Sequence, residues 1–124
     1  MQSPIKCYRD LEAWQKAMVL AEECYRVTAS FPAREEFILT AQMRRAAISV
    51  ASNIAEGHSQ STARYRHHLT IAVGSVAELA TQLELACRVG YVPRPTAAHM
   101  VGSIEHLTCV LHALLRSLRR TADG

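Results

Sequence analysis

The segment from Thr62 to Val89, TARYRHHLTIAVGSVAELATQLELACRV, decides the fold of this chain. Its apolar residues recur at alternating steps of four and three, which is the spacing of a helix face that packs lengthwise against other helices. They are Tyr65, Leu69, Ala72, Val76, Leu79, Leu83 and Ala86. Gly90 follows at once. The stretch therefore predicts one long helix over residues 62–89.

The residues before this helix predict two more. Asp10 is a suitable N-cap for a helix over about residues 10–28. Pro32, which a helix interior does not tolerate, separates that helix from one over about 33–56, and Gly57 is placed to end it as its C′ residue. Helical spacing connects Leu11, Trp14, Met18, Ala21 and Tyr25 in the first of these helices, and Leu39, Met43, Ala46, Val50 and Ile54 in the second.

The residues after position 89 predict a fourth helix. Pro93 and Pro95 stiffen the linker, and Thr96 caps a helix over about residues 96–120. Its apolar repeat comprises Met100, Ile104, Leu107, Leu111, Leu114 and Leu118. Short connections make neighbouring helices antiparallel, and a 3.5-residue repeat means left-handed packing. We expect an all-α, antiparallel up-down-up-down four-helix bundle in a single domain, residues 1–124.

Composition excludes several classes of protein. The chain has 124 residues, of which 49% are hydrophobic and 20% charged, and this length suits one domain. The longest apolar run is the five residues from Ala17 to Ala21, and no signal-peptide layout opens the chain, so we expect no membrane segment. The four cysteines form no C-x-x-C pair, which fits a reduced cytoplasmic protein better than a disulfide framework or a zinc site.

Catalytic and metal-binding patterns are missing from the sequence. A di-iron bundle needs Glu-x-x-His pairs, and none occurs. His99 and His106 share a face but lie ~10 Å apart along a helix, and adjacent histidines point ~100° apart. There is no Gly-x-Ser-x-Gly motif, and all glycines are isolated, so no loop cradles a phosphate. We expect a non-enzymatic protein with no metal, cofactor or small-molecule substrate.

Polar residues form stripes on the second and third predicted helices. The stripes comprise Gln42, Arg45, Ser49, Asn53 and Glu56 on one helix and Ser75, Glu78 and Gln82 on the other. Folding the hairpin near residues 57–62 places Arg45 within reach of Glu78 and Glu56 within reach of Arg64. We hypothesise a hydrogen-bonded polar seam that sets the register between these helices or between subunits. The alternative is a solvated face.

Basic residues gather at one end of the expected bundle. That end holds the whole formal net charge of +3, because the charges at the other end and in the middle cancel. Candidate nucleic-acid-binding residues are Lys6, Arg9, Arg64, Arg66, His67, His68, Arg116, Arg119 and Arg120. Arg64 and Arg66 stand at a helix N-terminus, where the helix dipole disfavours cations. Arg116, Arg119 and Arg120 stand at a C-terminus, where capping the helix is an equally good interpretation.

Additional apolar residues lie outside the heptad faces. They are Ile38, Ala41, Ile48 and Ala55 on the second helix and Ile71 and Leu85 on the third. A monomeric four-helix bundle has no partner for a second apolar face, so these residues predict an interface between subunits. The alternative is a set of scattered surface residues, which soluble proteins commonly carry.

Several motifs together resemble a known family. They are Tyr8 to Ala17 (YRDLEAWQKA), Phe31-Pro32, Leu39 to Ala47 (LTAQMRRAA), Ser49, Asn53 to Gly57 (NIAEG), Gly74 to Leu83 (GSVAELATQL) and Gly90-Tyr91. Over about residues 8–92 the chain resembles the small four-helix bundle proteins named after 23S rRNA intervening sequences. It departs from their pattern at Ala51-Ser52, where a proline is common nearby, and at Arg64 to His68, where an acidic-aromatic pair is usual.

The resemblance implies a cytoplasmic bacterial protein that forms a ring-shaped homo-oligomer, usually a pentamer, with no established enzymatic activity. More distant relatives are accessory proteins of diversity-generating retroelements, which associate with a reverse transcriptase and nucleic acid. Two functions follow as expectations. The protein binds RNA or an RNA-associated protein non-specifically through its basic end, or it is a protein-interaction scaffold that never contacts nucleic acid.

Overall fold

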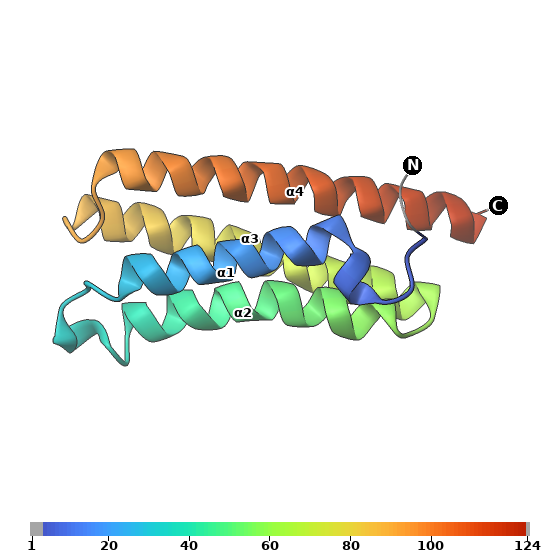
Figure 1. Ribbon diagram of the computed structural model, residues 1–124, viewed down its shortest axis with the longest axis horizontal. Coiled ribbons are helices and arrows are strands. Elements are labelled where there is room, and N and C mark those ends of the chain that lie inside the picture. Colours follow the sequence, from blue (N-terminus) through green and yellow to red (C-terminus); the bar gives the residue numbers. More distant parts are fainter. Residues whose placement is uncertain (1–3, 124) are drawn as a thin grey trace.

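The computed structural model describes residues 4–123, with side chains described through Arg119. Four antiparallel helices lie side by side: α1 (Glu12–Thr28), α2 (Leu39–His58), α3 (Thr62–Arg88) and α4 (Arg94–Asp123) (Figure 1). Two short 3-10 helices, η1 (Tyr8–Asp10) and η2 (Ala33–Glu35), precede α1 and α2, and residues 4–123 contain no strand. Each helix packs on its neighbours in sequence, and α1 also packs on α4. The predicted up-down-up-down four-helix bundle is confirmed.

The predicted inward faces of the second and third helices form the core. Every residue of those two heptad repeats is buried, from Leu39 to Ile54 on α2 and from Tyr65 to Ala86 on α3. On α4 the repeat is buried up to Leu111 and partly buried beyond it. By length and composition α3 could also cross a membrane. In the bundle its apolar repeat is buried, and overall 39% of the helix's most apolar stretch is buried.

Helix α1 turns a different face inward from the one that the spacing suggested. The residues buried along it are Ala13, Ala17, Leu20, Cys24 and Thr28. Of the predicted set only Leu11 is buried, and Met18 and Tyr25 are exposed. Two apolar lines with the same helical spacing run along α1 about 100° apart, so periodicity alone does not choose between them. The line with small residues faces the core and leaves the larger side chains outside.

The starts of three helices differ from the prediction. Asp10 does not cap α1: its carboxylate accepts hydrogen bonds from the backbone N–H groups of Lys6 (2.9 Å) and Cys7 (3.3 Å), and these bonds lower its pKa. Helix α2 begins at Leu39 because η2 and a turn occupy the preceding residues. Helix α4 begins at Arg94, so Thr96 lies inside its first turn instead of capping it.

Glycines at two positions have different structural roles. Gly90 has a φ of 89°, which ends α3 in the left-handed region that glycine adopts easily. Gly57, predicted as a C′ residue, lies instead inside the last turn of α2 and has no positive φ. A Cβ atom at Gly57 would lie 2.7 Å from Cβ of His68, so this glycine permits α2 and α3 to approach closely.

Candidate functional site

A chain of hydrogen bonds joins α2 to α3 along the predicted polar seam. The hydroxyl groups of Ser49 and Ser75 lie 2.8 Å apart, and Ser75 is buried. Asn53 Nδ2 donates to the Ser49 carbonyl (2.9 Å) and to Ser49 Oγ (3.1 Å). Asn53 Oδ1 lies 2.9 Å from Nδ1 of His68. The seam thus contains a continuous polar path from one helix to the other.

His68 belongs to this path, which the sequence alone did not reveal. Because Asn53 donates through its amide nitrogen, its oxygen is the acceptor, and His68 supplies the Nδ1–H donor. His68 is half-buried, whereas His67 is exposed. The sequence did contain an indication of this contact, because the hairpin register places Asn53 opposite the turn of α3 that contains His68. Of the two histidines, His67 is therefore the one exposed at the basic end.

The two ion pairs expected along the seam do not form. Within residues 4–119, no nitrogen of Arg45 comes within 4.0 Å of a Glu78 oxygen, and the same holds for Arg64 and Glu56. All four of these side chains are exposed, and an exposed pair gains little over hydration. Arg45 and Glu78 instead line a surface groove of about 640 Å³ between the helices. Gln42, which is exposed, and Gln82, which is half-buried, line the same groove, as do Ser49 and Ser75.

The predicted basic residues do share one end of the bundle. The start of the described chain, the α2–α3 connection and the end of α4 meet there, at the right of Figure 1. The exposed residues at this end are Lys6, Arg9, Arg64, His67, Arg116 and Arg119, with Arg66 half-buried. The guanidinium group of Arg9 stands over the rings of Tyr8 and Trp14, at 5.5 and 5.8 Å. The side chain of Arg120 lies outside the described residues.

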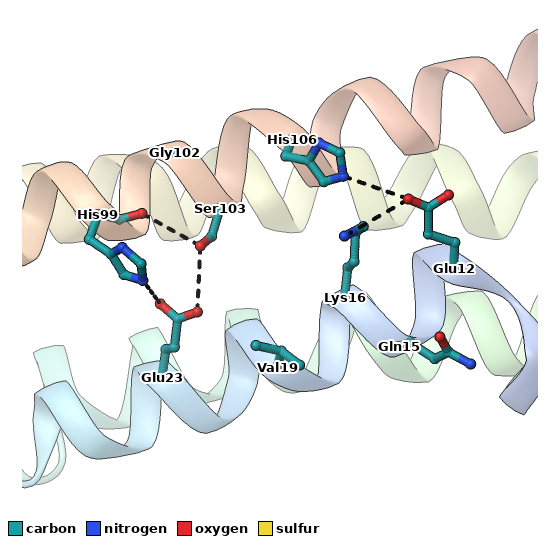
Figure 2. A pocket seen from close by; sticks show the side chains of 9 residues that line it. All are labelled: Glu12, Gln15, Lys16, Val19, Glu23, His99, Gly102, Ser103 and His106. Atoms are coloured by element: carbon teal, nitrogen blue, oxygen red, sulfur yellow. Dashed lines mark hydrogen bonds and ion pairs between the residues drawn. The ribbon is translucent and has the colours of Figure 1, made fainter.

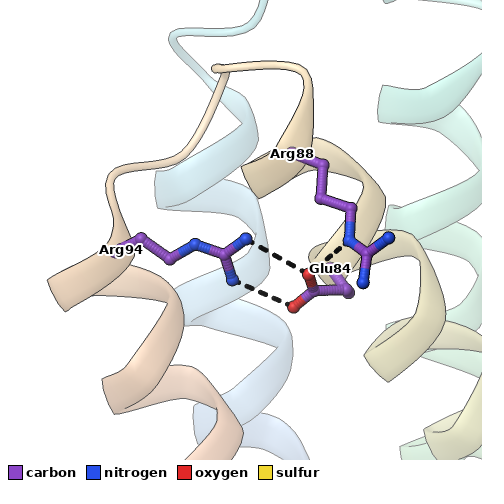
Figure 3. Close-up of polar contacts among 3 residues, drawn as sticks. All are labelled: Glu84, Arg88 and Arg94. Carbon is purple, nitrogen blue, oxygen red and sulfur yellow. Dashed lines mark hydrogen bonds and ion pairs between the residues drawn. The ribbon is translucent and has the colours of Figure 1, made fainter.

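Three arginines at the opposite end are held by acceptors. Glu84 lies between Arg88 and Arg94 (Figure 3), with Arg88 Nε at 2.8 Å and the nearest Arg94 nitrogen at 3.1 Å. Hydrogen bonds from the two guanidinium groups lower the pKa of Glu84. Arg34 likewise donates to the hydroxyl group of Tyr91 (3.4 Å). These arginines are therefore used within the fold.

Four guanidinium groups at the basic end are not bound by any acceptor within the described part of the fold. Among the side chains that the structure describes, those of Arg64, Arg66, Arg116 and Arg119 make no ion pair and no hydrogen bond. Each of these groups carries five N–H donors that have no acceptor among the described residues. At the opposite end three of the four arginines have acceptors, and Arg26 is the exception.

A second groove, of about 580 Å³, lies between α1 and α4 (Figure 2). His106 Nε2 lies 3.6 Å from Glu12, and His99 Nε2 lies 3.9 Å from Glu23. Ser103 donates to the other oxygen of Glu23 at 3.4 Å. His99 and His106 of α4 therefore face carboxylates of α1. Within the described residues, no three His, Cys, Asp or Glu side chains are grouped so that they could hold a metal ion.

The predicted interface residues lie on the surface of the single chain. Ile38, Ile48, Ile71 and Leu85 are exposed, and Ala41 and Ala55 are half-buried. Sequence reasoning missed further exposed apolar side chains, among them Phe37, Met18 and Tyr25. Met18 and Tyr25 were missed because their helical spacing suggested the core, and Phe37 because residues 33–38 were expected to be helical.

Comparisons with known proteins agree with the fold. The profile of a family described as 23S rRNA-intervening sequence protein matches residues 9–113. A similar solved structure, at 1.70 Å, is a protein with unknown function from the S23 ribosomal protein family of Bacteroides thetaiotaomicron VPI-5482. It is 23% identical, with a TM-score of 0.77, over 84% of this chain and 95% of that chain, so it shows a shared fold. No curated protein matches significantly. Because the profile spans α1 to α3 and most of α4, the chain belongs to the 23S rRNA-intervening sequence protein family.

Proposed function

We propose that the protein is a non-enzymatic, self-associating four-helix module of the cytoplasm that binds RNA, or an RNA-associated protein, through its basic end. Recognition is electrostatic and independent of base sequence. No membrane, cofactor or small-molecule substrate takes part. The assembly is a homopentamer, the number implied by the family resemblance.

One observation carries this proposal: four arginines of the basic end make no ion pair or hydrogen bond within the described chain, whereas of the four arginines at the other end Arg34, Arg88 and Arg94 do and Arg26 does not. A guanidinium group presents a planar set of donors that suits phosphate oxygens. Arg64 also sits in the first turn of α3, where the helix dipole disfavours a cation. A cation that stands where the helix dipole disfavours it is typical of a functional position.

Self-association strengthens this argument. Subunits in a ring with their basic ends on one side would add their charges within a few Debye lengths of one another. Such a field attracts polyanions through release of condensed counterions, whatever their sequence. Binding is then steeply dependent on salt and similar for unrelated RNAs.

A salt titration tests the proposal. Binding of two unrelated single-stranded RNAs is measured from about 50 to 200 mM salt for wild type and for Arg64→Ala/Arg66→Ala. The slope of log K against log salt should fall in magnitude by ~0.7 for each phosphate group that the variant no longer neutralises. Arg88→Ala/Arg94→Ala is the matched control, because it removes the same charge from the other end and should keep the wild-type slope. Equal effects of the two variants, or no retention of RNA at low salt, would refute the proposal.

An interaction scaffold without nucleic-acid binding is the second candidate. It is favoured by the packing of the aromatic residues at the basic end, which leaves none free to stack on bases. Tyr65 is buried, and burial raises its pKa to about 12. Tyr8 and Trp14 contact each other edge to face, with ring centres 5.2 Å apart. In this case the basic end docks an acidic protein surface, and RNA is not retained at any salt concentration.

A further inference from the structure

The connection between α1 and α2 carries two exposed apolar side chains, Phe37 and Ile38, which we call the projection. In Figure 1 this segment extends beyond the ends of both helices at the left of the molecule. Phe37 is 85% exposed, the most of any large hydrophobic side chain among the described residues, and Ile38 beside it is 59% exposed. A phenylalanine this exposed buries almost none of its surface against its own chain, so its ring is free to pack against another molecule.

A groove on the flank of the bundle, between α1 and α2, offers a matching apolar surface. Its volume is about 490 Å³. Its lining residues are Met18, Ala21, Tyr25, Ile48 and Ala51, with Glu22, Arg26 and Ser52 at its edges. Met18 and Ile48, from the two helices, are both exposed, so the apolar lining is open to solvent.

The side chain of Tyr25 is held in one orientation within this groove. The guanidinium carbon of Arg44 stands 4.4 Å from the centre of the Tyr25 ring. Arg44 is itself fixed, because its Nε donates to the hydroxyl group of Thr28 at 2.9 Å. An aromatic ring held in one orientation loses little side-chain entropy when another ring packs against it.

We propose that Phe37 and Ile38 of one copy of this chain insert into the α1–α2 groove of the next copy. This inference rests on the self-association proposed above and names the two surfaces that make the contact. Charge permits the pairing, since Glu36 adjoins Phe37 and the groove is bordered by Arg26 as well as by Glu22, so that Glu36 can meet the cation. Within residues 4–119 neither Glu36 nor Arg26 makes an ion pair.

The contact joins two different patches, because the projection lies at the end of the bundle and the groove along its side. Such a contact is head-to-tail, and its repetition closes into a ring when the rotation permits. Ile38 and Ile48 then lie on opposite sides of one interface, as projection and groove. Ile71 and Leu85, on α3, do not take part in this contact.

Disulfide trapping tests which surfaces meet. Cys7 and Cys109, the exposed native cysteines, are first replaced by serine. Purified Glu36→Cys and Ser52→Cys proteins are then mixed, allowed to exchange subunits and oxidised; Glu36 is exposed beside the projection, so Phe37 and Ile38 are kept. We expect a disulfide-linked dimer that contains one chain of each variant. An Ala98→Cys protein, changed at an exposed position on α4, should form no such product with Glu36→Cys. Equal yields from the two mixtures would overturn the proposal.

Light scattering after size-exclusion chromatography separates this inference from self-association itself. Wild type should exceed the monomer mass at micromolar concentration, and Phe37→Asp and Ile48→Asp should each lose the assembled species. Val101→Asp, on the exposed face of α4, is the charge-matched control and should assemble like wild type. If Phe37→Asp stays assembled and the trapping fails, self-association stands and the projection-in-groove contact is wrong. If wild type is monomeric, both are wrong. Because Phe37 is almost fully exposed, its replacement leaves the fold intact, which circular dichroism verifies.

Discussion

Gly57 lies so close to His68 that a methyl group on Gly57 would stand 2.7 Å from the Cβ atom of His68. Cβ is attached to the backbone and cannot swing away, so any larger residue would force α2 and α3 apart. The same two helices share the hydrogen bond between Asn53 and His68, one turn away from Gly57 on α2. Close approach and polar pairing therefore depend on each other at this point of the seam.

Replacing Gly57 with alanine should destabilise the protein. Overpacking at a tight contact costs ~1–3 kcal/mol, which exceeds the gain in helix propensity. Gly74→Ala is the control, since a Cβ atom there meets nothing within 4 Å, and it should stabilise α3 by ~0.5–1 kcal/mol. Urea unfolding followed by circular dichroism measures both. Equal shifts of the two midpoints would contradict the close-approach role of Gly57.

Asn53→Ala should weaken the seam. The change removes the acceptor of His68 Nδ1, and leaving this half-buried donor without a partner costs ~1–3 kcal/mol, whereas Ser49 keeps its hydrogen bond with Ser75. Ser52→Ala changes the adjacent exposed side chain and should stay within ~0.5 kcal/mol of wild type. The free energy of unfolding from denaturant titration compares the two. A solvated face instead of a seam would make both variants neutral.

The contribution of Glu84 to stability should depend on pH. Hydrogen bonds from Arg88 and Arg94 depress its folded pKa, so its contribution is present above the ordinary glutamate value of 4.5. That contribution is lost as the pH falls through the lower folded pKa. The difference in melting temperature between wild type and Glu84→Gln should therefore be largest near neutral pH and vanish in acid. Glu105→Gln, which removes an exposed charge from α4, serves as the control. A difference independent of pH would show that the carboxylate charge is not involved.

The four cysteines should divide into two pairs by reactivity. Cys7 and Cys109 are exposed, whereas Cys24 and Cys87 are buried, and burial raises the pKa of the Cys24 thiol to about 11. A chromogenic disulfide reagent at pH ~8 should label two thiols rapidly in the native protein and all four in denaturant. Rapid labelling of more than two thiols in native protein would mean that the core around Cys24 or Cys87 opens readily.

The heptad spacing of residues 39–54, 65–86 and 100–111 determined the fold class, because in each of these stretches the apolar line with alternating steps of three and four is continuous and is the one that the bundle buries. Residues Ser49, Asn53 and Ser75 of the seam could also be identified from their spacing, since hairpin geometry places α2 and α3 side by side. Contacts between two helices that a short hairpin connects follow from the spacing of their residues along the sequence.

Tertiary structure alone decided the rest. Two apolar lines compete on α1, and only the space left between α2 and α4 selects the one with Ala13 and Ala17. Gly57 has the place of a helix terminator in the sequence, and only its distance to His68 shows the close approach that it permits. Exposed pairs such as Arg45 and Glu78 can be adjacent without pairing, because hydration competes with an attraction that is weak in water. The exposure of Phe37 likewise depends on where α2 begins, and that start is set by packing between elements that sequence spacing does not describe.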